Sequence, residues 1–296
     1  MSYAPELDLA NLKAIDIHTH VEIDSTGHRS VDDELMDASA AYFKATDTRT
    51  PTIEQIADYY RQRSMAAVVF TVDATTALGR PPNSVTELAE RAADHPDVLI
   101  PFGSVDPWAP DAVERVGLLV ERYGVRGFKF HPGIQAFRPN EERFAPIYAA
   151  IAAAGVPALF HTGQTGIGAG LPGGRGIKLH YSDPLLLDDV AADFPDLTLI
   201  MAHPAVPWVD VQISIATHKP NAFIDLSGWS PKYFPPQLVR AANSLLQDKV
   251  LFGTDFPLIS PDRWLADAER LDFKPEVLPK LLKDNALRVL GLRQEG

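Results

Sequence analysis

The chain has 296 residues, no cysteine and a formal net charge of −12. The absence of cysteine excludes disulfides and thiolate metal ligands, and the acidic charge argues against broad binding to a nucleic-acid backbone. No apolar run reaches the roughly 18 residues of a membrane span, and the N-terminus lacks the pattern of a signal peptide. We therefore expect a cytoplasmic protein with a small-molecule substrate and without nucleic-acid or membrane partners.

Eight short apolar runs rich in Val, Ile, Leu and Phe recur along the chain. Their apolar character is largely continuous, which is typical of parallel strands covered on both faces. The runs are 14–23, 66–72, 97–102, 125–130, 156–161, 197–203, 221–226 and 249–255. Between several of them lie segments with helical spacing of apolar residues, at 50–64, 84–96, 111–124 and 140–155. The glycine-rich segment 161–184 is expected to be a long loop.

Two prolines indicate where helices begin. Pro51 follows Thr50, and Pro261 follows Ser260. Because proline is favoured in the first turn of a helix behind a hydroxyl cap, we predict helix starts at both places.

Repetition of a strand followed by a helix predicts the fold class. About eight such units in one chain favour an α/β architecture, a single (β/α)8 TIM barrel domain spanning residues 1–296. A doubly wound open sheet is the alternative. In a barrel, catalytic side chains come from the carboxyl ends of the strands.

Five of the eight runs end in side chains that can bind a metal or move a proton. These residues are His18, His20, Lys129, His131, His161, His203 and Asp255. A single histidine at a strand end is more often an ordinary hydrogen-bonded residue than a ligand. Their joint occurrence at strand ends instead predicts a metal site built from imidazole and carboxylate.

Strand alternation gives an expectation for where these side chains point. It places Asp16 on the same face as His18 and His20, and it directs His203 away from Ala202. The histidines would then converge on the mouth of the barrel.

The motifs around these residues resemble a known family. "HTH", "GFKFHP", "FHTG", "AHP" and "FGTDFP", in this order, are similar to the amidohydrolase superfamily, in its branch related to aminocarboxymuconate-semialdehyde decarboxylase. The resemblance implies one divalent metal ion, usually zinc in that branch, with His18, His20, His161 and Asp255 as its ligands. It also implies His203 as the catalytic histidine, and homodimers are common in the family.

Lys129 allows two interpretations. Other branches of the superfamily bridge two metals with a carbamylated lysine at the end of the fourth strand. Alternatively, Lys129 is a cation that pairs with Asp255 or orients a substrate oxygen in the catalytic site. We favour the second interpretation, because the branch that the sequence resembles holds one metal.

A divalent ion held by three imidazoles and a carboxylate lowers the pKa of bound water and polarises a carbonyl oxygen. Asp255 would then accept a proton from water, while His203 would stabilise an oxyanion or protonate the leaving group. Longer stretches, including 161–184 and 225–258, resemble a subgroup of 4-hydroxyphenyl-β-ketoacyl-CoA hydrolases. This implies hydrolysis of the carbon–carbon bond of an aromatic β-ketoacyl-CoA to an aromatic acid and acetyl-CoA.

The alternative function is a zinc-dependent non-oxidative decarboxylase of an aromatic or muconate-type acid, in which Arg263 or Lys129 would hold the carboxylate. The substrate-binding residues that we expect at the mouth of the barrel are His131, Arg175, Lys178, Trp208, Trp229 and Arg263. A CoA thioester would need local cations such as Arg175 and Lys178, because the chain as a whole is acidic.

Overall fold

The structure is a computed structural model that describes residues 2–43 and 50–292. Its strands form two parallel sheets, in the orders β1-β2-β3 and β4-β5-β6-β7-β8. The strands are β1 (Ala14–His20), β2 (Met65–Phe70), β3 (Leu99–Pro101), β4 (Phe128–Phe130), β5 (Ala158–His161), β6 (Leu199–Ala202), β7 (Ala222–Asp225) and β8 (Val250–Leu251). Seven of these eight fall within the predicted apolar runs, and β2 begins at Met65, one residue before its run.

Hydrogen bonds across two seams close these sheets into a barrel. Between β8 and β1, the Ile17 N–H donates to the Phe252 carbonyl over 3.1 Å, and the Asp255 N–H donates to the His18 carbonyl over 3.0 Å. Between β3 and β4, the Arg126 N–H donates to the Pro101 carbonyl over 2.8 Å. The barrel prediction is confirmed, and the open-sheet alternative is wrong.

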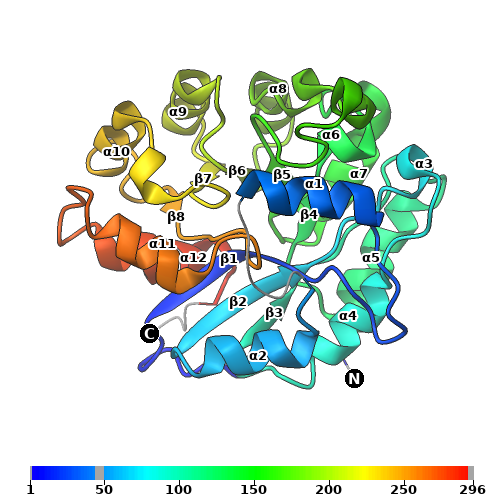
Figure 1. The fold of residues 1–296 in the computed structure, drawn as a ribbon, viewed down its shortest axis with the longest axis horizontal. Helices are drawn as coiled ribbons and strands as arrows, with labels where there is room; N and C mark the ends of the chain where they lie inside the picture. The colour runs from blue at the N-terminus through cyan, green and yellow to red at the C-terminus, as the bar shows by residue number, and fades with distance from the viewer. Residues whose placement is uncertain (1, 44–49, 293–296) are drawn as a thin grey trace.

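Helices surround the strands (Figure 1). They are α1 (Asp33–Phe43), α2 (Ile53–Arg61), α3 (Thr75–Leu78), α4 (Val85–Ala92), α5 (Ala112–Tyr123), α6 (Pro132–Gln135), α7 (Ala145–Ala153), α8 (Leu185–Asp193), α9 (Val209–His218), α10 (Pro236–Ala242), α11 (Pro261–Ala268) and α12 (Asn285–Val289). Short 3₁₀ turns are η1 (Glu142–Phe144), η2 (Pro172–Gly176), η3 (Leu179–Ser182) and η4 (Pro231–Tyr233), and η5 (Lys280–Asp284) is a π-helical turn. No helix in the described ranges is long and apolar enough to cross a membrane.

The two predicted helix starts have different outcomes. Ser260 caps α11 with Pro261 in its first turn, as predicted. The prediction for Thr50 is wrong, because α2 begins behind Thr52. The Thr52 side chain accepts from the Gln55 N–H and the Gln55 side chain accepts from the Thr52 N–H. This reciprocal capping box satisfies two otherwise unpaired N–H groups, and it outweighs the preference of Pro51 for the first turn.

The strands separate two apolar layers. The interior of the barrel is filled by side chains such as Ile17, Val68 and Leu251, which α12 extends with Leu287 and Leu290. A larger layer packs between the strands and the surrounding helices. The polar residues at the carboxyl ends of the strands therefore lie above a filled barrel, and this end carries the candidate site.

Candidate active site

A cavity of about 410 Å³ lies at the carboxyl ends of the strands. All seven polar residues predicted at strand ends line it, together with Trp229 and Arg263: His18, His20, Lys129, His131, His161, His203 and Asp255. Helix α1 contributes Met36, Ser39, Ala40 and Tyr42 to the wall, so it covers part of the mouth. Figure 1 shows this helix crossing the front of the molecule.

Three side chains converge closely enough to hold one cation. Single ligand atoms from His18, His20 and Asp255 lie within 4.8 Å of one another. Asp255 Oδ1 is 3.3 Å from His18 Nε2 and 3.1 Å from His20 Nε2. Ligand atoms about 2.0–2.2 Å from a tetrahedral ion lie about 3.3–3.6 Å apart, so this spacing is close to that of a coordination sphere.

His161 provides an independent sign of a missing partner. Its Nε2 atom is buried and has no hydrogen-bond partner among the described residues. Its ring is stacked on His131, with centroids 3.9 Å apart, and lies 4.7 Å from the ring of His203. A buried imidazole nitrogen without a partner is costly unless a ligand satisfies it. His161 therefore fits the place of a fourth metal ligand.

Two carboxylates orient the histidines of the "HTH" motif. Asp225 Oδ2 is 2.6 Å from His18 Nδ1, and Glu22 Oε1 is 2.9 Å from His20 Nδ1. A carboxylate on Nδ1 keeps the proton there and leaves the Nε2 lone pair for a metal. This donor set fits a divalent ion.

Neither carboxylate was among the predicted site residues. Asp225 is the last residue of β7 and lies one residue before the end of the seventh apolar run, so its position gave a signal of the kind used for the other strands. Glu22 lies two residues beyond His20, within the run 14–23, and only its place beside that histidine could have indicated its role.

The alternation of side chains along a strand explains the direction of some of these side chains but not of all. The register of β1 shifts between Asp16 and Thr19. Asp16 faces away from the histidines and accepts hydrogen bonds from the Tyr60 and Thr254 hydroxyls. The prediction that Asp16 shares the face of His18 is wrong, because the irregularity in β1 turns His18 into the barrel.

His203 and Asp255 reach the cavity through unusual backbone conformations. Their φ angles are +72° and +68°. Ala202 belongs to the interior layer of the barrel, so alternation alone would turn His203 outward. The left-handed backbone redirects the imidazole instead. Such conformations cost about 1–3 kcal/mol for residues other than glycine and tend to occur at functional sites.

Protonation states follow from burial and neighbouring charges. Burial, aided by the positive charge of Lys129, holds the pKa of His18 and of His131 well below the usual range. Burial and the neighbouring histidines do the same for the pKa of His161, so these rings are neutral. Burial lowers the pKa of His203 to about 4, against the opposing charge of Asp255.

The carboxylate of Asp255 raises the proton affinity of His20. Although burial opposes it, the hydrogen bonds to Asp255 and Glu22 raise the pKa of His20 to about 9. Burial also acts against ionisation of Asp255, but the hydrogen bond from His20 and nearby positive charges lower the pKa of Asp255 below its usual value. Without a metal, the pair is therefore an imidazolium beside a carboxylate at neutral pH.

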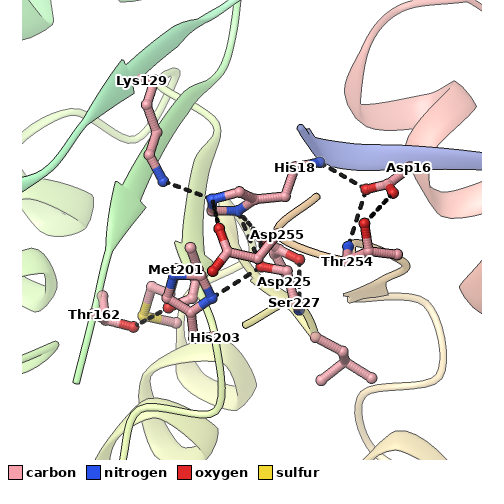
Figure 2. Close-up of polar contacts among 12 residues, drawn as sticks. Asp16, His18, Lys129, Thr162, Met201, His203, Asp225, Ser227, Thr254 and Asp255 are labelled. Atoms are coloured by element: carbon pink, nitrogen blue, oxygen red, sulfur yellow. Dashed lines mark hydrogen bonds and ion pairs between the residues drawn. The ribbon is translucent and has the colours of Figure 1, made fainter. Parts of the chain in front are cut away.

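Lys129 is a buried cation beside the ligand cluster. Its Nζ atom lies 3.1 Å from His18 Nε2 (Figure 2). Burial lowers the pKa of Lys129 to about 8, while Asp255 and Asp225 oppose that shift. Lys129 is thus largely charged at neutral pH, yet close to losing its proton.

Three predicted substrate-binding residues lie outside the cavity wall. Arg175 Nε is 2.9 Å from Glu34 Oε2, so this side chain ties η2 to α1. The Lys178 side chain is exposed and its ammonium is 6.0 Å from the Tyr181 ring. Trp208 lies directly before the first residue of α9, and its side chain makes no capping hydrogen bond. The direction of a side chain in a loop depends on its local contacts and not on the alternation of a strand. The positions of these three residues could therefore not be predicted from the sequence.

Solved structures with the same fold include several enzymes. An uncharacterized TIM-barrel protein from Bordetella bronchiseptica is 23% identical with a TM-score of 0.76, over 95% of this chain and 99% of that chain. A dihydroxybenzoic acid decarboxylase from Polaromonas with bound manganese is 16% identical with a TM-score of 0.67, over 96% and 98%. A probable 2-pyrone-4,6-dicarboxylic acid hydrolase from Acinetobacter baumannii is 15% identical with a TM-score of 0.62, over 95% and 100%. No curated protein matches the chain.

At these identities the solved structures establish a common fold alone. The family comparison goes further, since the model described as amidohydrolase matches residues 15–292, nearly the whole chain. Its span includes every residue of the candidate metal cluster. The chain belongs to the amidohydrolase family.

Proposed function

We propose that this chain is a metal-dependent hydrolase that uses water to cleave the carbon–carbon bond of an aromatic β-ketoacyl-CoA. The observation that carries the proposal is the position of Asp255. Its closest contacts to His18 and His20 are both made through Oδ1, and no other described side chain forms a hydrogen bond with this carboxylate. Oδ2 is therefore available to orient and deprotonate water at the edge of the cavity.

The ligand set would hold one divalent ion, zinc or manganese, through His18, His20, His161 and Asp255. Such an ion lowers the pKa of water and polarises a carbonyl oxygen. Zinc is our first choice, because imidazole-rich sites suit it. Manganese is the second, because three of the structural neighbours contain it.

The residues of this chain divide the proton transfers between them. Asp255 accepts a proton from the water that attacks the β-keto carbon, and Lys129 offers positive charge to the resulting alkoxide. The bond between the β-keto carbon and the α-carbon then breaks, and its electron pair becomes an enolate. His203 Nε2 takes this proton from Asp255 and delivers it to the α-carbon, so one water and one β-ketoacyl-CoA give one aromatic acid and one acetyl-CoA.

The composition of the cavity wall suits a substrate with an aromatic acyl group. Most of the residues around the polar end are apolar, and Trp229 is among them. The side chain of Arg263 also lines the cavity, and no ion pair to it is present in the described part of the chain. An unpaired guanidinium at the wall favours an anionic substrate group such as a phosphate or carboxylate.

A non-oxidative decarboxylase of an aromatic acid is the second candidate. Lys129 favours it, because a buried ammonium beside the ligand cluster offers a cation for a substrate carboxylate. This reaction consumes no water, so the fate of water oxygen distinguishes the candidates.

The test is to incubate the metal-loaded protein with 4-hydroxyphenyl-β-ketopropionyl-CoA, and separately with hydroxybenzoates, in water enriched in oxygen-18. Detection of oxygen-18-labelled 4-hydroxybenzoate together with acetyl-CoA by mass spectrometry would support hydrolysis. Carbon dioxide from a hydroxybenzoate, with the thioester untouched, would overturn it. His203→Asn should abolish turnover, whereas His218→Asn, on the exposed end of α9, is the matched control.

A further inference from the structure

One serine connects the metal-ligand cluster to the catalytic histidine. Ser227 Oγ lies 2.9 Å from His203 Nδ1, 2.7 Å from Asp225 Oδ2 and 3.0 Å from His18 Nδ1. All four side chains are buried. Figure 2 draws the contacts that join these side chains.

Counting the available protons assigns a direction to each hydrogen bond. The 2.6 Å contact between His18 Nδ1 and Asp225 Oδ2 uses the proton on His18. The Ser227 hydroxyl has one proton, which it donates to Asp225 Oδ2 over 2.7 Å. The contact from Ser227 Oγ to His18 Nδ1 shares the proton that His18 already donates to Asp225. The contact to His203 then requires a proton on Nδ1 that His203 donates to Ser227 Oγ. His203 Nε2 is left as a lone pair.

The surrounding backbone holds this arrangement in place. The Ser227 N–H donates to Asp225 Oδ1 over 2.9 Å, so serine and carboxylate form a compact turn. A Cβ atom added at Gly228 would lie 2.3 Å from His203 Nδ1, and one added at Gly253 would lie 2.2 Å from Asp225 Oδ1. Both glycines allow backbone to press against the hydrogen-bonded atoms, which restricts rotation of the ring.

We infer that Ser227 is a positioning residue that fixes His203 as the tautomer with its proton on Nδ1, with Asp225 as the shared anchor of His203 and His18. The inference rests on the proposed function, in which His203 Nε2 receives the proton released from water and passes it to the α-carbon. A ring with a bare Nε2 is ready to receive that proton. The opposite tautomer would present an N–H and could not.

The first test needs no substrate. Zinc-loaded protein with ¹⁵N-labelled histidine is examined by NMR correlation of the ring nitrogens with the ring carbon-bound protons, which distinguishes a protonated from a bare nitrogen. His203→Asn identifies the His203 signals. We expect a protonated Nδ1 and a bare Nε2 at neutral pH. A proton on Nε2 overturns the inference, whichever substrate the enzyme uses.

The second test separates positioning from packing. We expect Ser227→Ala to keep its bound zinc, measured by elemental analysis, and to lower kcat about 10- to 100-fold with little change in KM. Ser227→Thr retains the hydroxyl and should recover most of the rate. Ser214→Ala, an exposed serine on α9, is the control. Wild-type kcat in Ser227→Ala, or a Thr variant as slow as the Ala variant, contradicts the inference. Absence of any turnover would refute the proposed function and leave the NMR result to decide this one.

Discussion

At the scale of single residues, we expect His20 to couple metal binding to proton release. Its two carboxylate partners, Asp255 and Glu22, raise its pKa to about 9 in the metal-free protein, so the ring is protonated at neutral pH. A metal needs the bare Nε2 and must displace that proton. Affinity should therefore rise about tenfold per pH unit below pH 9 and level off above it.

Calorimetry in buffers with different ionisation enthalpies measures the protons released on zinc binding. We expect about one proton per zinc at pH 7, which follows from the pKa of His20. Glu22→Gln removes one carboxylate and should reduce that number. Zinc binding at pH 7 without proton release would show that His20 is neutral or is not a ligand.

Gly228 is a position where one methyl group should affect catalysis. Its φ is +71°, and an added Cβ would lie 2.3 Å from His203 Nδ1. We expect Gly228→Ala to displace His203, to lower kcat about 100-fold and to reduce the free energy of unfolding by about 1–3 kcal/mol. In the control Gly117→Ala, the added Cβ meets no atom within 4 Å. That helical variant should gain about 0.5–1 kcal/mol. Kinetics and urea unfolding check both, and unchanged kcat in Gly228→Ala would contradict the prediction.

The sequence identified site residues at the ends of strands far better than site residues whose role depends on contacts between distant parts of the chain. His18, Lys129 and His161 follow continuous apolar runs, and parallel strands must bring such ends together. Ser227 carries no comparable signal. Its role depends on distances to His18 and His203, which lie 209 and 24 residues away along the chain.

At the scale of elements, α1 and the long loop after β5 form adjoining parts of the cavity wall. Arg175 of η2 pairs with Glu34 of α1 and lies 3.6 Å from Asp32, while Gln164 donates to the Tyr42 hydroxyl over 2.7 Å. The Arg175 and Glu34 side chains are 52% and 58% exposed, so each ion pair is worth about 0–1 kcal/mol. These exposed contacts therefore stabilise the position of α1 against the loop only modestly.

Arg175→Ala should therefore raise KM up to about fivefold, with kcat unchanged, since 1.4 kcal/mol corresponds to a factor of ten. Steady-state kinetics provide the measurement. Exchanging the charges in Arg175→Glu with Glu34→Arg should restore KM. If Arg175 bound the phosphates of CoA instead, the exchanged pair would stay impaired, and only thioester substrates would be affected.

The elements themselves could be predicted because their signals are local. Apolar runs marked all eight strands, and the Ser260–Pro261 pair marked the start of α11. The cap of α2 was misplaced because Thr50 and Thr52 offer the same hydroxyl, and only the Gln55 side chain distinguishes them. The irregularity in β1 depends on pairing with β2, which a single strand does not reveal.

At the scale of the whole molecule, the metal site spans one of the two seams that close the barrel. His18 and His20 belong to β1 of the first sheet, whereas Asp255 follows β8 of the second, and their backbones are joined by the 3.0 Å bond from the Asp255 N–H to the His18 carbonyl. The seam between β3 and β4 contributes no residue to the three-residue cluster. A bound ion would therefore strengthen one seam selectively.

Removing the metal with a chelator should lower stability in a localised way. Free metal at 100 times its Kd adds about 2.7 kcal/mol to the free energy of unfolding, which is lost on chelation. Hydrogen exchange followed by mass spectrometry should then accelerate in peptides containing the Ile17 and Asp255 amides. Peptides containing Gly103 and Arg126, at the other seam, should keep their rates. Equal acceleration at both seams would mean that the ion stabilises the barrel globally, and no change at the first seam would place the ion elsewhere.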